Sequence, residues 1–62
     1  MVNRLKEVRL EKRMTQEELA EKSSVSRPTI VSIERNEAND VKASTMLKLA
    51  TALDVSVDTI FF

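Results

Sequence analysis

The side chains best suited to chemistry lie between residues 26 and 36, in a segment whose apolar spacing predicts a helix. Arginine, serine and threonine donate hydrogen bonds to phosphate oxygens and base edges, so they suit contact with nucleic acid. Arg27 could give two hydrogen bonds to O6 and N7 of a guanine, and Val31 could pack on a thymine methyl group. Pro28 offers no donor and can make only apolar contact. The complete set predicted to meet double-stranded DNA is Gln16, Ser26, Arg27, Pro28, Thr29, Val31, Ser32, Arg35 and Asn36.

Two short helices must position these side chains. The apolar spacing predicts helices over residues 16–22 and 27–35, joined by a tight turn. Thr15 and Glu18 have the spacing of a capping box ahead of the first helix, and Ser26 is expected to cap the second. A second helix that its partner holds outward is the layout of the helix-turn-helix motif, which places that helix in the major groove of DNA.

The rest of the chain predicts further helices at about Val2–Lys12, at Thr45–Leu53 with Ser44 as its cap, and at Val57–Phe61. Five helices and a polar loop over residues 37–43 make an all-α chain, and residues 1–62 are expected to form a single domain. Helices this short do not persist alone in water, so they must share one core. The sequence has no signal peptide and no run able to span a membrane, so we expect it to act in the cytoplasm without membrane contact.

The composition argues against an enzyme. The chain has no His, Cys or Gly, so the residues that usually build metal sites, nucleophilic triads and glycine-rich phosphate loops are missing. The acidic residues are scattered over predicted helix surfaces and do not form an acid/base pair. We therefore expect no catalytic residue, no metal, no cofactor and no small-molecule ligand.

The net charge is zero, but the charge is unevenly distributed. Residues 1–36 hold eight Lys and Arg against six Asp and Glu, a balance of +2, and residues 37–62 hold two against four, a balance of −2. This dipole could orient the chain on DNA. Non-specific affinity for DNA should nevertheless be modest and strongly dependent on salt.

The most specific pieces of the sequence are TQEELA, VSxxTI and IER in the first half, and LKLAxALxVxxxxIF near the end. With these pieces in this order, nearly the whole sequence resembles the phage-repressor/Cro-like helix-turn-helix proteins, the XRE family. The resemblance implies a compact five-helix, lambda-repressor-like DNA-binding domain that contains a helix-turn-helix.

The resemblance also implies roles for individual residues. Gln16 would clamp the DNA backbone, and Arg9 and Glu34 would form a partly buried structural salt bridge. Ser24 and Asn36 depart from the family, which often has glycine with a positive φ at both positions. Asparagine tolerates the left-handed region, whereas serine at the first position is expected to cost about 1 kcal/mol relative to glycine.

The tail of the chain suggests a second copy. A core this small has room for one of the two final phenylalanine rings, so the other should be exposed. An exposed apolar patch of this kind often marks an interface between proteins. The residues predicted to join two copies are Val57, Ile60, Phe61 and Phe62.

We therefore predict a transcriptional regulator, a repressor, that binds a palindromic operator as a homodimer. Each recognition helix would enter a major groove, with half-sites about 34–36 Å apart. A bacterial or phage genome would encode the protein, which would act at the nucleoid. Two alternatives use the same domain: an antitoxin or restriction-modification controller protein, and a protein-interaction module that has lost DNA binding.

Overall fold

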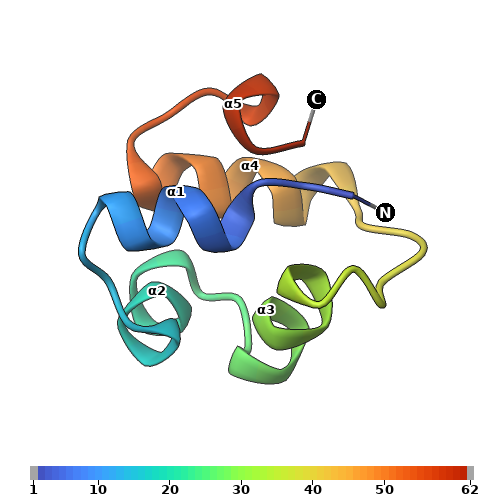
Figure 1. The fold of residues 1–62 in the computed structure, drawn as a ribbon, viewed down its shortest axis with the longest axis horizontal. Coiled ribbons are helices and arrows are strands. Elements are labelled where there is room, and N and C mark those ends of the chain that lie inside the picture. The colour runs from blue at the N-terminus through green and yellow to red at the C-terminus, as the bar shows by residue number, and fades with distance from the viewer. Residues whose placement is uncertain (1, 62) are drawn as a thin grey trace.

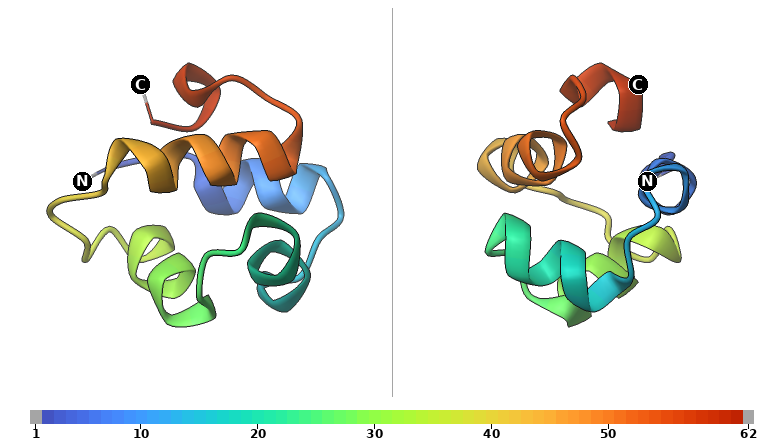
Figure 2. Two further views of the ribbon diagram at one scale, coloured as in Figure 1. Left: turned by 180° about the vertical axis from the view of Figure 1, so that it is seen from behind. Right: turned by 90° about the vertical axis from the view of Figure 1, so that its left-hand side faces the viewer.

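The computed structural model describes residues 2–61, which form five helices and the segments that connect them (Figure 1). Helices α2 and α3 contact each other on one side of the fold, α2 against α4 and α3 against α1, and α5 lies on the opposite side against both α1 and α4 (Figure 2). The fold is all-α, as the sequence predicts. The helices are α1 (Leu5–Glu11), α2 (Gln16–Ser23), α3 (Arg27–Glu34), α4 (Ala43–Leu53) and α5 (Val57–Phe61).

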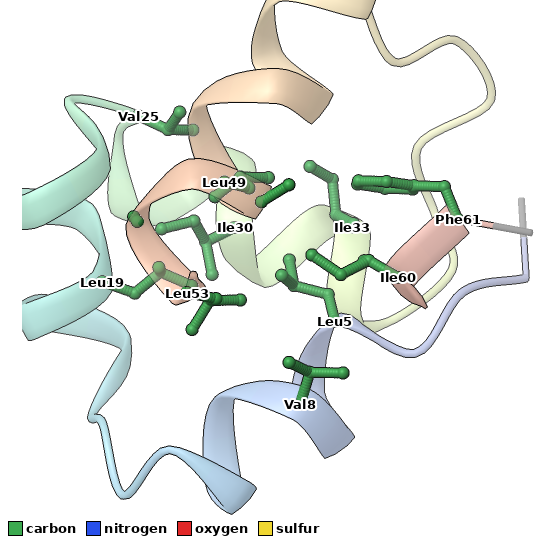
Figure 3. Close-up of a cluster of buried hydrophobic side chains, with 12 residues drawn as sticks. Leu5, Val8, Leu19, Val25, Ile30, Ile33, Leu49, Leu53, Ile60 and Phe61 are labelled. Atoms are coloured by element: carbon green, nitrogen blue, oxygen red, sulfur yellow. The ribbon is translucent and has the colours of Figure 1, made fainter. Parts of the chain in front are cut away.

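One apolar core lies between the helices, and every helix contributes to it (Figure 3). Leu5, Leu19, Ile30, Leu49 and Ile60, one from each helix, are fully buried. Since none of these helices is long enough to persist alone, this shared core is what stabilises them. The buried apolar residues are Leu5, Val8, Leu19, Val25, Ile30, Ile33, Leu49, Ala50, Ala52, Leu53, Ile60 and Phe61.

The start of α2 follows its sequence signal closely. Thr15 Oγ1 accepts a hydrogen bond from the Glu18 backbone N–H at 3.0 Å, and the Thr15 N–H donates to Glu18 Oε1 at 2.9 Å. Both halves of the predicted capping box are therefore present. The box satisfies an N–H group that a helix start leaves without an intrahelical partner, so the beginning of α2 is well defined.

Helix α1 does not begin at Val2, the first residue predicted for it. Asn3 and Arg4 precede the helix, and each makes a hydrogen bond to the helix start or to a distant segment. Asn3 Oδ1 accepts from the Leu5 N–H at 2.9 Å, and the Arg4 N–H donates to the Ile60 carbonyl at 2.8 Å. The helix therefore begins at Leu5.

The prediction for the start of α4 was also wrong. The helix begins at Ala43, with Lys42 at the N-cap position and no side-chain hydrogen bond to the helix. Ser44 thus lies inside the first turn and is not the cap. A hydroxyl residue near a helix start suits both positions, and the path of the preceding loop decides between them.

Among residues 2–61, four residues, none of them glycine, adopt the left-handed conformation. Ser24 (φ 61°) and Asn36 (φ 58°) do so as predicted, and Arg13 (φ 57°) and Asp54 (φ 57°) do so without having been predicted. Each lies at the end of a helix or in the turn that follows it. A positive φ costs most residues free energy, because Cβ approaches the backbone. The turns of this fold therefore carry strain.

We predict that Ser24→Gly raises the free energy of unfolding by about 0.5–1 kcal/mol, because glycine accepts a positive φ at little cost. Urea unfolding followed by circular dichroism would measure it. Lys22→Gly is the matched control, since the same residue placed inside α2 should lower stability by about 0.5–1 kcal/mol. A loss of stability in both variants would contradict the assignment of strain to Ser24.

Candidate nucleic-acid interface

Helices α2 and α3 form the helix-turn-helix that the sequence predicts. Ile30 and Ile33 point from α3 into the core, which leaves the opposite side of this helix facing outward (Figure 3). Arg27 and Arg35, at its two ends, are exposed, and Ser32 between them is half-buried. The outward side of α3 therefore presents two cations and a hydroxyl, which suit phosphates and base edges.

A buried ion pair fixes α3 against α1. Arg9 Nε lies 2.7 Å from Glu34 Oε2 and Arg9 Nη2 lies 3.1 Å from Glu34 Oε1, so the pair is bidentate. The two side chains are only 9% and 4% exposed. Arg9 Nη1 also donates to the Met14 carbonyl at 2.7 Å, which attaches the turn before α2 to the same group. The predicted structural salt bridge is confirmed.

Gln16 belongs to this network, which the sequence did not indicate. Its Nε2 donates to Glu34 Oε1 at 3.1 Å, and the residue is half-buried. An amide nitrogen carries two hydrogens, so one remains for a DNA phosphate. Gln16 is the first residue of α2, where the helix dipole favours an anion. The carboxylate thus orients the side chain that the resemblance assigns to the DNA backbone.

The two hydroxyls at the start of α3 pair with each other. Ser26 Oγ and Thr29 Oγ1 are 2.8 Å apart, and both residues are exposed. Ser26 occupies the N-cap position as predicted, but its side chain caps no backbone N–H. The predicted capping bond is therefore wrong, although the position is right. A hydroxyl has two lone pairs and one proton, so each group keeps capacity for a DNA contact.

The C-terminal end of α3 is tied to the start of the chain. Asn3 Nδ2 donates to the Ile33 carbonyl at 2.9 Å and lies 3.3 Å from Asn36 Oδ1. Arg35 follows the helix and stays exposed, so its guanidinium is available to a phosphate. Asn36 is exposed as well, but Asn3 already holds its amide oxygen.

Lys6 joins the candidate surface, and the sequence prediction did not include it. It lines a shallow hollow together with Gln16, Arg27, Val31 and Arg35. Lys6 lies three residues before Arg9 on α1, and residues at this spacing are neighbours on one helix face. The position of Arg9 could therefore have indicated it. Three exposed cations, Lys6, Arg27 and Arg35, surround the hollow.

The predicted dimer residues separate into different environments. Ile60 and Phe61 lie in the core, so they offer almost no surface to a second copy and that part of the prediction was wrong. Phe61 is the single ring that was expected to close the core. Val57 is half-buried against the core, and Phe62 lies outside the described residues.

Within residues 2–61, no group of three or more acidic, His or Cys side chains is placed to hold a metal ion. Among the same residues, no helix is long and apolar enough to cross a membrane.

Comparison with known proteins identifies the fold. A family model described as helix-turn-helix matches residues 5–60, almost the whole chain. The chain belongs to this family. The expected kinship with the XRE-type regulators is thereby confirmed, and the chain is a DNA-binding transcription regulator with a helix-turn-helix.

A solved structure is similar over most of the chain. It is the crystal structure of the restriction-modification controller protein C.AhdI from Aeromonas hydrophila, with 39% sequence identity and a TM-score of 0.84. The match covers 90% of this chain and 83% of that one. No curated protein matches the chain.

We predict that Glu34→Ala lowers the free energy of unfolding by about 3–5 kcal/mol, because it leaves the guanidinium of Arg9 buried without its partner. Thermal unfolding followed by circular dichroism would measure this.

Glu7→Ala is the matched control, since it breaks the ion pair of Arg4 and Glu7, whose side chains are 51% and 58% exposed. The side-chain hydrogen bond from Arg4 holds the pKa of the Glu7 carboxyl below its usual value. Exposed pairs contribute little to stability, so the melting temperature should hardly change. Equal melting temperatures for the two variants would refute a special role for the buried pair.

Proposed function

We propose that this regulator represses transcription by binding a palindromic operator as a homodimer. The observation that carries the proposal is the outward side of α3. Arg27, Ser32 and Arg35 lie on this side, and the opposite side of the helix is packed in the core. Arg27 would read a guanine, and Arg35, Gln16 and other polar residues on this surface would bind the backbone.

Dimerisation is part of the proposal, because one copy has a small footprint and no net charge. The described residues span 25 × 22 × 19 Å. Two copies side by side would bring their recognition helices within reach of half-sites about 34–36 Å apart. We propose that the copies meet near the start of α5, where Val57 is half-buried.

A second candidate function is control of a restriction-modification system. The observation that favours it is the 39% identity to the controller protein C.AhdI over 90% of this chain. The same DNA-reading surface would serve both functions, and they differ in which genes the operator precedes.

A third candidate is a protein-interaction module that does not bind DNA. The absence of net charge favours it, but the exposed arginines at the two ends of α3 favour DNA.

We propose no catalytic step and no cofactor for this chain. A regulator of this kind acts where the chromosome lies, which supports a role in the cytoplasm of a bacterium, at the nucleoid, with either the host or a phage as the source of the gene.

The first test is selection of bound DNA from a random pool at low salt. We expect enrichment of a symmetric motif whose halves lie about one helical turn apart, because each copy presents one recognition helix. Sedimentation of the protein with the selected duplex should give two copies per site. Absence of any enriched motif would reject sequence-specific binding and would favour the interaction module.

We predict that Arg27→Ala lowers the preference for the selected operator over random DNA by about 5- to 150-fold, since a bidentate contact to guanine contributes about 1–3 kcal/mol of discrimination. Competition binding at fixed salt would measure this ratio.

Arg35→Ala is the matched control, because it removes the same side chain from the other end of the recognition helix. A phosphate contact carries no sequence information, so this variant should weaken binding to both DNAs about equally. The slope of the logarithm of the binding constant against the logarithm of the salt concentration should fall by about one. An unchanged ratio for Arg27→Ala would show that Arg27 does not read a base.

A further inference from the structure

The arginine proposed to read a base has a partner within the protein. Arg27 Nη1 lies 3.7 Å from Glu17 Oε1, and the two side chains are 57% and 79% exposed. Glu17 is the second residue of α2 and Arg27 is the first residue of α3, so the ion pair joins the starts of the two helices of the motif. Neither side chain contributes to the apolar core.

The geometry leaves one edge of Arg27 for DNA. The closest approach of Glu17 is to Nη1, and a guanidinium carries five N–H donors in a planar fork. Arg9 shows in the same molecule how one guanidinium serves two acceptors: its Nε and Nη2 bind a carboxylate while its Nη1 binds a carbonyl. Arg27 can likewise keep Nη1 beside Glu17, in an ion pair at 3.7 Å without a hydrogen bond, and offer Nε and Nη2 to a guanine.

We propose that Glu17 is a positioning residue for base recognition. It restricts the long side chain of Arg27 before DNA arrives, so less conformational entropy is lost when the base contact forms. This inference rests on the proposed function, in which Arg27 reads a base.

Glu17 has a second effect that acts in the opposite direction. It puts a negative charge beside Gln16, where a DNA phosphate is proposed to bind, and so weakens contacts that depend on charge alone. Non-specific binding is almost entirely electrostatic, whereas the selected site also gains the base contact. The charge of Glu17 therefore lowers the affinity for both DNAs, and only the positioning of Arg27 favours the operator relative to random DNA.

The test compares Glu17→Gln with Glu21→Gln, which removes the same charge from an exposed position further along α2. Binding would be measured to the selected duplex and to the same duplex with the contacted guanine replaced. Both variants should bind random DNA somewhat more tightly, because each has one negative charge fewer. Only Glu17→Gln should reduce discrimination for guanine, by about two- to fivefold, the effect expected of an exposed ion pair.

Two further variants separate positioning from charge. Glu17→Asp keeps the charge but shortens the side chain by one methylene, so discrimination should fall without tighter binding to random DNA. In an Arg27→Ala background, Glu17→Gln should change discrimination no more than Glu21→Gln does. Melting temperatures close to that of the unmodified protein would show that each variant is folded.

The inference would be overturned if Glu17→Gln and Glu17→Asp both discriminated guanine as well as the unmodified protein. Failure of the proposed function gives a different result. In that case the unmodified protein would select no motif, or Arg27→Ala would leave the preference for the operator unchanged.

Discussion

The bidentate ion pair of Arg9 and Glu34 is the interaction on which the candidate DNA-binding surface depends. It joins α1 to α3, and its two residues also hold the Met14 carbonyl before α2 and the amide of Gln16. One pair of charges therefore sets the mutual orientation of the helices that would contact DNA. Because the pair is buried, its parts cannot separate without exposing or stranding a charge.

Local signals in the sequence predicted much of the fold. The spacing of Thr15 and Glu18 predicted a capping box that is present, and the left-handed conformation of Asn36 was also predicted. Such features depend on a few neighbouring residues, so a sequence can reveal them. The wrong starts of α1 and α4 have a different origin: Asn3 and Lys42 are placed by contacts with distant segments or by the path of a loop.

The candidate site was predicted in outline but not in its internal bonds. The residue types on α3 indicated a polar outward face, and the exposure of Arg27 and Arg35 agrees with it. The links from Gln16 to Glu34 and from Glu17 to Arg27 join α2 to α3, and no local pattern shows them. The apolar residues at the tail predicted that these side chains are buried, but not by which surface. Ile60 was therefore assigned to a contact with a second copy, whereas the core of the same chain covers it.

The segment before α1 has a consequence for how the domain unfolds. Asn3 Nδ2 donates to the Ile33 carbonyl of α3, and the backbone N–H of the next residue, Arg4, donates to the Ile60 carbonyl of α5. Helices α3 and α5 are thus bonded to adjacent residues, α3 to the side chain of Asn3 and α5 to the backbone N–H of Arg4. Opening of the end of α3 should therefore loosen α5 as well. Amide hydrogen exchange in the two helices would then report a single cooperative opening and not two local ones.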